Sequence, residues 1–248
     1  MKNNTKLSIN LNAVALLRNR RNLPWPDIIE IARYALRAGA HGITIHPRPD
    51  ERHIKYSDIK ILSNFLKDEF KDASFNIEGY PSDKFLDLAM PYANQITLVP
   101  DSPQQNTSDH GWDIKKHKDI LNSATKKIRS QKNIIISAFI DSGVENLSYL
   151  KKINIDRIEL YTGPYAACYN NDIKIKKELS ALQITATNAQ NINLGVNAGH
   201  DLTVANIPKL VSYIDNIEEV SIGHGLIADA LIYGMENTVN RFLYALNA

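Results

Sequence analysis

Hydrophobic and polar positions along the chain fall into two kinds of segment. Short runs rich in β-branched and apolar residues alternate with longer stretches in which apolar residues recur at helical spacing. Eight short runs indicate strands: Leu7–Leu11, Gly42–His46, Ser74–Glu78, Gln95–Val99, Ile134–Ile140, Arg157–Tyr161, Asn193–Asn197 and Val220–Ile222. Because strands that alternate with helices pair in parallel, the pattern predicts an α/β fold, an eight-stranded parallel (β/α)8 TIM barrel.

Three helix starts are marked by residues that favour the N-cap position. These are Ser57 before Asp58–Phe70, Ser82 before Asp83–Tyr92, and Thr203 before a segment that reaches Val211. No proline- or glycine-rich linker and no residue-level repeat interrupts the series. We therefore expect residues 1–248 to form a single barrel domain.

Polar residues with acid–base or anion-binding chemistry close nearly every apolar run. They are Asn10, His46, Glu78, Asp141, Glu159, Asn197 with His200, and Gly223 with His224. In this fold the active site lies at the carboxyl ends of the strands. The layout therefore predicts a barrel enzyme.

Composition and charge exclude several other classes of protein. The net charge is only +2, and the lysines and arginines are spread evenly, which argues against nucleic-acid or anionic-membrane partners. No apolar run approaches the roughly 18 residues of a membrane span, and Met1–Lys6 is polar, so we expect a cytoplasmic protein. The single cysteine, Cys168, excludes an internal disulfide and cannot alone form a thiolate metal site; we expect a partly buried side chain.

The segment His46–His53 carries two histidines and two arginines, and two prolines stiffen it. Arginine offers planar, permanently charged donors to phosphate, and histidine can move a proton near neutral pH. The loop therefore favours a phosphorylated substrate. The alternative is an exposed charged loop in which the arginines pair with Asp50 and Glu51.

Two glutamates lie in or at the end of predicted strands. Glu78 is followed by Gly79-Tyr80-Pro81, and burial in this mostly apolar setting is expected to raise its pKa toward that of a general base. The alternative is a structural carboxylate paired with an arginine. Glu159 has apolar neighbours on both sides, so its side chain points either into the barrel or toward the helices. We expect the inward orientation, in which the carboxylate could stabilise cationic intermediates.

Glycine-containing turns follow the last two strands. Gly199-His200-Asp201 follows the seventh strand, and Gly223-His224-Gly225 follows the eighth and opens the last helical region. Free backbone N–H groups at a helix start bind phosphate well, and this barrel position is a recurrent phosphate site. The alternative is a simple helix-entry turn.

With these motifs in this order, the chain resembles the pyridoxine 5'-phosphate synthase family of vitamin B6 biosynthesis, from about Leu7 to the last helix. The resemblance is carried by Asn10–Arg21, Gly42–His53, Asn76–Glu78, Leu98–Pro100, Val196–Leu202 and Ser221–His224. It implies a barrel with extra short helices and an octamer built from dimers. It also implies condensation of 1-deoxy-D-xylulose 5-phosphate with 3-amino-2-oxopropyl phosphate, with release of phosphate and water and with no metal or organic cofactor.

The resemblance also implies a role for each matching residue. His46 and Glu78 match the family's proton acceptors, His200 its proton donor and Glu159 its transition-state stabiliser. The aminoketone phosphate would be bound by Asn10, Arg21, Asp201, Gly223 and His224, and the deoxyxylulose phosphate by Asn12, Ala13, Arg48, His53 and Thr107. The residue matching Arg21 is also a candidate to reach the site of a neighbouring subunit.

Three positions depart from the commonest family pattern. Many members have Asp-His where this chain has Asn12-Ala13, and glycine where it has Asp201. Ala13 offers only its backbone to the deoxyxylulose phosphate. The departures suggest a subtype of the family.

The same residues are also compatible with other functions. His46, Glu78 and His200 are suitable zinc ligands, although no His-x-x-x-His spacing fixes two of them on one element. A barrel that only binds phosphorylated ligands as a scaffold or sensor is the non-enzyme reading, favoured by Ala13. Another sugar-phosphate isomerase or epimerase is the nearest enzyme alternative, because fold alone does not select the reaction. No lysine ends a predicted strand, which argues against a Schiff-base aldolase.

The polar segment Pro100–Trp112 follows the fourth strand and contains Thr107. We expect it to be a mobile lid that excludes water from reactive intermediates. The alternative is an ordinary surface loop.

Overall fold

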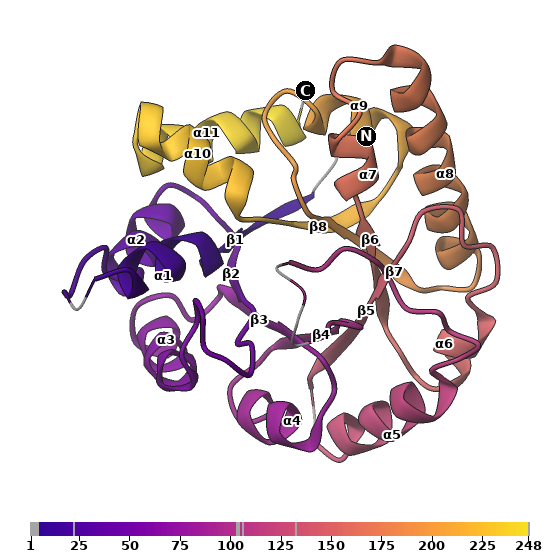
Figure 1. Ribbon diagram of the computed structural model, residues 1–248, viewed down its shortest axis with the longest axis horizontal. Coiled ribbons are helices and arrows are strands. Elements are labelled where there is room, and N and C mark those ends of the chain that lie inside the picture. Colours follow the sequence, from indigo (N-terminus) through magenta and orange to yellow (C-terminus); the bar gives the residue numbers. More distant parts are fainter. Residues whose placement is uncertain (1–4, 22, 103–104, 106, 132, 248) are drawn as a thin grey trace.

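The computed structural model describes residues 5–21, 23–102, 105, 107–131 and 133–247. Within these residues, eight parallel strands pair in chain order into a closed barrel that helices surround (Figure 1). The strands are β1 Lys6–Asn10, β2 Gly42–Ile45, β3 Ser74–Gly79, β4 Gln95–Leu98, β5 Ile135–Ile140, β6 Arg157–Tyr161, β7 Gly195–Gly199 and β8 Ile217–Ile222. The predicted fold is confirmed, and each strand overlaps the run that predicted it.

The helices occupy the stretches between and after the strands. They are α1 Asn12–Asn19, α2 Ile28–Arg37, α3 Tyr56–Glu69, α4 Asp83–Ala89, α5 Lys118–Arg129, α6 Ser148–Lys152, α7 Gly163–Ala166, α8 Asp172–Asn191, α9 Ile207–Tyr213, α10 His224–Tyr233 and α11 Met235–Leu246. Three strands are followed by two helices each: β1 by α1 and α2, β6 by α7 and α8, and β8 by α10 and α11. The extra short helices implied by the family resemblance are therefore present.

Alternation along the strands separates an apolar layer from a polar barrel interior. On β2, Ile43 and Ile45 are fully buried and belong to the apolar core, whereas Thr44 between them bonds the Ser8 hydroxyl inside the barrel (2.7 Å). The same rule turns Asn76 inward on β3, where its amide nitrogen lies 3.5 Å from the Thr44 hydroxyl. Most of the apolar core therefore lies between the strands and the helices, and polar side chains fill the centre.

Of the three predicted N-caps, only Ser82 is confirmed. Its hydroxyl accepts the Phe85 N–H at the start of α4 (3.2 Å). The prediction for Ser57 is wrong, because α3 begins at Tyr56, two residues before the predicted start at Asp58, and the Asp58 carboxylate accepts the Lys55 N–H (2.8 Å).

The prediction for Thr203 is also wrong. Its backbone N–H donates to the Asn206 side chain (2.7 Å), so these residues form a turn before the helix. Helix α9 begins at Ile207, where Pro208 suits the first turn because its missing N–H would have no partner there.

Candidate active site

A cavity of about 440 Å³ opens at the carboxyl ends of the strands. Every residue predicted to act on or bind a substrate lines it, with the exception of Arg21. These lining residues are Asn10, Asn12, Ala13, His46, Arg48, His53, Glu78, Thr107, Glu159, His200, Asp201, Gly223 and His224. Side chains from seven different strands or their following loops thus converge on one space, as the barrel topology requires.

Two asparagines connect the ends of β1 and β2. The Asn10 side-chain oxygen accepts the Asn12 backbone N–H (3.0 Å), and the Asn12 side-chain oxygen accepts the His46 backbone N–H (2.9 Å). Asn12 therefore fixes the backbone of the residue that follows β2. Ala13 lies next in the first turn of α1 and lines the same side of the cavity.

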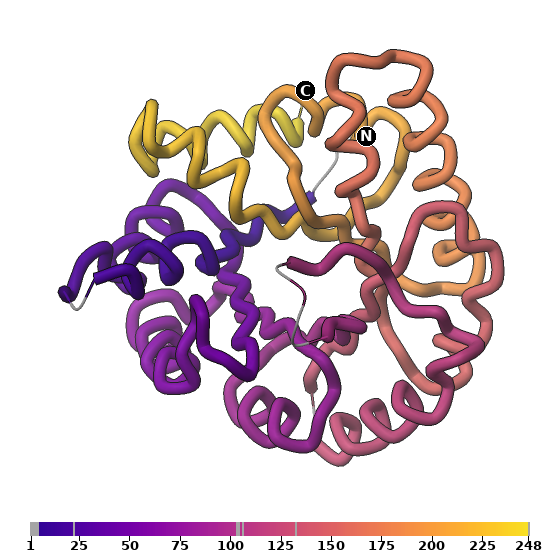
Figure 2. The backbone as a smooth tube through the Cα atoms, viewed as in Figure 1, coloured from indigo at the N-terminus to yellow at the C-terminus, as the bar shows by residue number. Residues whose placement is uncertain are grey.

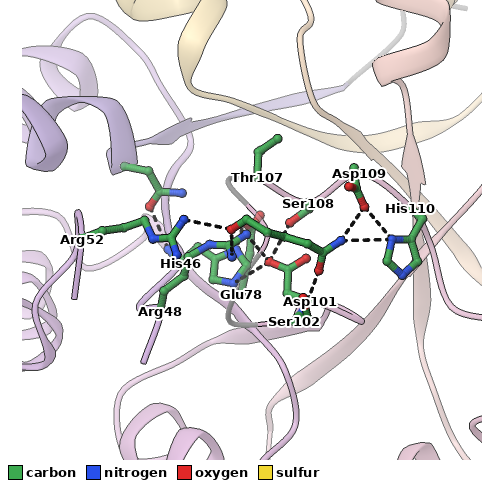
Figure 3. Close-up of polar contacts among 12 residues, drawn as sticks. His46, Arg48, Arg52, Glu78, Asp101, Ser102, Thr107, Ser108, Asp109 and His110 are labelled. Carbon is green, nitrogen blue, oxygen red and sulfur yellow. Dashed lines mark hydrogen bonds and ion pairs between the residues drawn. The ribbon is translucent and has the colours of Figure 1, made fainter. Parts of the chain in front are cut away.

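His46 lies between two carboxyl groups in the centre of the site (Figure 3). Its Nδ1 is 3.7 Å from Glu78 Oε2, and its Nε2 is 3.4 Å from Asp101 Oδ2. Asp101 Oδ2 also accepts from the Arg48 guanidinium (2.5 Å) and from the Ser108 hydroxyl (3.0 Å). The result is a buried cluster in which one carboxylate contacts both a candidate base and a candidate phosphate ligand.

The loop from His46 to His53 has features of both alternatives predicted from sequence, a phosphate-binding loop and an exposed charged loop. Arg52 pairs with Asp50 (2.7 Å), as expected for an exposed charged loop, whereas Arg48 is buried and faces the cavity. Both guanidinium groups also donate to the Gln105 carbonyl oxygen (2.9 Å each). The arginines therefore contact the β4–α5 connection, which contributes Thr107 and Ser108 to the cavity.

Burial and neighbouring carboxylates change the acid–base properties of both glutamates. Burial, with Glu159, Asp101 and Glu219 nearby, raises the pKa of Glu78 well above its usual value, against the opposing effect of Arg48. Burial and the Glu219 carboxylate raise the pKa of Glu159 to about 8, opposed by a hydrogen bond from the Thr97 hydroxyl (3.4 Å). The raised pKa expected for Glu78 and the inward orientation expected for Glu159 are both found.

The two histidines near Arg48 are shifted in the opposite direction. Burial, assisted by the cationic Arg48 and Arg52, lowers the pKa of His53 to about 4. Burial and then Arg48 lower the pKa of His46 well below its usual value. At neutral pH, His46 is therefore the unprotonated form that can accept a proton.

The neighbourhood of Glu159 requires a glycine on the next strand. A Cβ atom at Gly199 would lie 2.4 Å from Glu159 Oε1 and 3.3 Å from the Ser221 carbonyl oxygen. Any side chain at position 199 would therefore displace the carboxyl group of Glu159.

His200 and Asp201 directly follow β7 and line the cavity. The Nε2 of His200 is 3.0 Å from the Thr107 hydroxyl, and its Nδ1 is 2.8 Å from Asp201 Oδ2. Tyr161 holds its ring edge-on to the imidazole at 5.1 Å. The candidate proton donor thus has an orienting contact at each nitrogen.

Gly223 and His224 form the turn into α10, and both line the cavity. Within the described residues, no side chain caps the start of this helix, so its first backbone N–H groups are available to an anion. The backbone at Gly223 lies close to Asn10, because a Cβ atom added to this glycine would be 3.2 Å from the Asn10 side chain. The ends of β1 and β8 are therefore close together at this point.

Arg21 lies just beyond α1 and outside the cavity of its own chain.

Cys168 is half-buried, as expected, and its thiol contacts the Pro164 carbonyl oxygen (3.1 Å). Asp141, which directly follows a predicted strand, accepts the Gly111 N–H (2.7 Å) and so anchors the β4–α5 connection at this residue. In Figure 2 this connection crosses the ring of strands in projection.

Several residues of the site were not predicted from sequence. Asp101 is the most important, because it contacts the lining side chains of His46 and Arg48. The cavity is also lined by Leu16, Val99, Ser108, Phe139 and Ser221. Asp101 has a recognisable signal, because it is an acidic residue directly after the Val99-Pro100 end of a strand. Phe139 and Ser221 follow from alternation, which turns them into the barrel.

The zinc site considered from sequence is not formed by the described residues. Among them, no group of three His, Cys, Asp or Glu side chains is placed to hold a metal ion.

None of the described helices is both long enough and apolar enough to cross a membrane.

Closed parallel topology, ionisable side chains at the strand ends and an uncapped helix start together define an α/β-barrel enzyme with an acid–base, anion-binding site. The chain belongs to the PdxJ family, whose model, described as pyridoxal phosphate biosynthesis protein PdxJ, matches residues 7–248.

Curated relatives match along nearly the full length of the chain. The pyridoxine 5'-phosphate synthase of Chelativorans sp. (strain BNC1) is 53% identical over 246 residues, which cover 98% of this chain and 99% of that protein. The pyridoxine 5'-phosphate synthase of Rhizobium meliloti (strain 1021) is 51% identical over 240 residues, 96% of each chain.

Solved structures share the fold at low sequence identity. Phosphoribosyl anthranilate isomerase from Thermotoga maritima superposes with a TM-score of 0.58 at 14% identity and covers 98% of both chains. This likeness shows the barrel alone, since the same fold supports many reactions.

Proposed function

We propose that this chain is a pyridoxine 5'-phosphate synthase that joins 1-deoxy-D-xylulose 5-phosphate to 3-amino-2-oxopropyl phosphate and releases phosphate and water. The observation that carries the proposal is the convergence of His46, Glu78, Glu159 and His200 with anion-binding groups on one cavity. The family match over residues 7–248 favours this activity over that of another sugar-phosphate isomerase on the same fold.

His46 and Glu78 act as the proton acceptors in this proposal. Condensing an amine with a ketone, losing water, eliminating phosphate and closing a ring all require proton transfers. His46 is buried and unprotonated at neutral pH, which suits a base. Burial raises the pKa of Glu78 well above its usual value, and a cationic substrate beside it would favour the carboxylate form that accepts a proton.

His200 acts as the proton donor and Glu159 as the stabiliser of cationic intermediates. The two residues lie on adjacent strands or their ends, since Glu159 is on β6 and His200 directly follows β7. A cationic intermediate beside Glu159 would lower the pKa of this carboxyl and favour its charged form. The protein would thereby supply negative charge at the step that needs it.

Separate groups bind the two phosphates. The uncapped start of α10 at Gly223 and His224, with Asn10 beside it, suits the aminoketone phosphate. Arg48, His53 and Thr107 suit the deoxyxylulose phosphate, and Asn12 and Ala13 line the cavity near them. Holding both substrates in one cavity supplies rate through proximity. The proposed reaction needs no metal ion or organic cofactor.

We further propose that the chain assembles into an octamer built from dimers and works in the cytoplasm. An exposed apolar surface on α10 and α1 supports self-association: Leu231 is 80% and Ile232 is 75% exposed, and Leu16 and Leu17 are exposed on the adjacent α1. In Figure 1, α10 and α11 lie along the same side of the barrel as α1 and α2. The position of Arg21 outside its own cavity is compatible with binding in a neighbour's site.

Product identification tests the activity, and sedimentation tests the assembly. Mass spectrometry should detect pyridoxine 5'-phosphate only when both substrates are present, and its absence would overturn the proposal. A Leu231→Glu variant should sediment as a smaller species than the wild type. An unchanged sedimentation coefficient would exclude this surface as an interface.

A further inference from the structure

His200 and Asp201 form a hydrogen-bonded pair of adjacent residues at the cavity wall. The Nδ1 of His200 lies 2.8 Å from Asp201 Oδ2. Because an ionised carboxylate has no proton to donate, the hydrogen in this bond belongs to the imidazole. Neutral His200 is therefore held as the Nδ1–H tautomer, with Nε2 free to accept from the Thr107 hydroxyl (3.0 Å).

Asp201 is ionised at neutral pH. The hydrogen bond from His200 lowers the pKa of Asp201 against the opposing effect of burial, and His200 and His224 lower it further when they are protonated. The carboxylate can therefore stabilise a protonated His200 beside it.

The backbone is held in an uncommon conformation that makes this contact possible. His200 and Asp201 both have positive φ angles, 86° and 56°. Residues other than glycine rarely adopt this region, and such strain persists where the surroundings enforce it. Here the Thr162 hydroxyl donates to the His200 carbonyl oxygen (2.5 Å), and the Asn206 amide donates to that of Asp201 (3.3 Å).

We propose that Asp201 is a positioning residue for His200, which it orients so that Nε2 exchanges protons with the substrates. The proposal rests on the proposed function in assigning proton transfer to His200. His200 Nε2 first takes the proton that the substrate amine loses on adding to the ketone. The imidazolium then gives this proton to the leaving oxygen, which departs as water, and His200 returns to the neutral Nδ1–H tautomer. Asp201 keeps its negative charge throughout and takes no proton.

This role differs from direct binding of the aminoketone phosphate, the role that the family resemblance implies for Asp201. A carboxylate beside a phosphate would be repelled by it, whereas its Oδ2 already accepts a hydrogen bond from His200. Backbone N–H groups at Gly223 and His224 offer a better anion site on the same cavity.

Nitrogen-15 NMR of the substrate-free protein tests the pair without relying on turnover. The variant is Asp201→Gly, because glycine readily adopts the positive φ at this position. The control is Asp172→Asn, which removes a carboxylate that is 92% exposed and pairs only loosely with Lys209 (3.4 Å). The His200 signal is assigned by its loss in His200→Gln.

The wild type and the Asp172→Asn control should show neutral His200 with its proton on Nδ1. In Asp201→Gly the proton should move to Nε2 in a substantial fraction of molecules. An Asp201→Gly spectrum identical to that of the wild type would overturn the proposal. Since no substrate is present, this result is independent of whether the proposed reaction occurs.

Turnover separates positioning from substrate binding. Asp201→Gly should lower kcat roughly tenfold to a hundredfold, within the range that general acid–base groups contribute, and should leave KM for both substrates within about twofold. A raised KM for the aminoketone phosphate with unchanged kcat would show a phosphate ligand instead and would overturn the inference. Absence of turnover in the wild type would contradict the proposed function, while the tautomer measurement would still decide the pairing.

Discussion

His46 and Glu78 face each other from the ends of neighbouring strands, with Nδ1 of the imidazole 3.7 Å from Oε2 of the carboxyl group. Burial shifts both groups toward their neutral forms, since it lowers the pKa of His46 and raises that of Glu78. A cationic amine entering the cavity would favour ionised Glu78. Substrate binding would therefore generate the second base at the moment it is needed.

The buried Glu159 should make stability fall as pH rises. Its folded pKa of about 8 lies above the unfolded value near 4.5, so its contribution is fully present below about pH 4.5 and is lost progressively up to about pH 8. Glu159→Gln should remove this loss and gain roughly 2 to 4 kcal/mol relative to the wild type at pH 8.5. Urea unfolding at pH 5 and pH 8.5 measures the difference.

The exposed Glu236 offers a control for this experiment, since Glu236→Gln should leave the pH dependence of the wild type unchanged. Equal loss of stability between the two pH values in the wild type and in Glu159→Gln would contradict the assignment of the raised pKa to Glu159.

Asp101 should stabilise the substrate-free protein by compensating the charge of Arg48. Both side chains are buried, and removing one partner of a buried ion pair costs about 3 to 5 kcal/mol; Asp101→Asn, which keeps a hydrogen-bond acceptor, should cost about 3 kcal/mol. Deoxyxylulose phosphate replaces the lost negative charge, so it should raise Tm more in the variant than in the wild type. Thermal unfolding with and without this ligand measures both effects.

Asp50→Asn is the matched control for Asp101→Asn. Its carboxylate also pairs with an arginine, Arg52, but is 50% exposed, so its loss should cost less than about 1 kcal/mol. Similar destabilisation by the two substitutions would mean that burial of the Arg48–Asp101 pair has no special role.

The connection between β4 and α5 should close over bound substrates. Residues 103, 104 and 106 lie outside the described residues, but Thr107 and Ser108 line the cavity. The Asp101 and Asp141 carboxylates accept hydrogen bonds from Ser108 and Gly111 of this connection. A protease that cleaves beside aspartate should cut at the exposed Asp109 more slowly when phosphate ligands are bound. Cleavage beside Asp215, outside the site, serves as the internal control, and equal rates at Asp109 with and without ligand would exclude a lid.

Alternation and strand counting were sufficient to predict the barrel and the orientation of its inward side chains. Glu78 and Glu159 could be assigned to the site because each lies in a run whose apolar neighbours must face the helices. Asp101 was not assigned although it directly follows a predicted strand, because its role depends on contact with Arg48, which is distant in sequence. The single-domain organisation stays a prediction.

Helix starts were harder to predict, because several polar residues near each start compete for the same backbone groups. Asp58 rather than Ser57 bonds the N-terminal backbone of α3, and the Asn206 side chain takes the Thr203 N–H. The position of Arg21 outside the cavity also could not be foreseen, since an α1 of eight residues carries position 21 away from the barrel axis.

The most direct test of the account is the rate of pyridoxine 5'-phosphate and inorganic phosphate formation from both substrates after chelator treatment, for the wild type and for Glu78→Gln. The account predicts metal-independent product from the wild type and a kcat about 10²- to 10⁴-fold lower in the variant, with both phosphates still bound. An equal rate in Glu78→Gln would contradict the role of this carboxyl as a base. If the wild type binds either phosphorylated substrate but forms no product, the proposed synthase activity is contradicted.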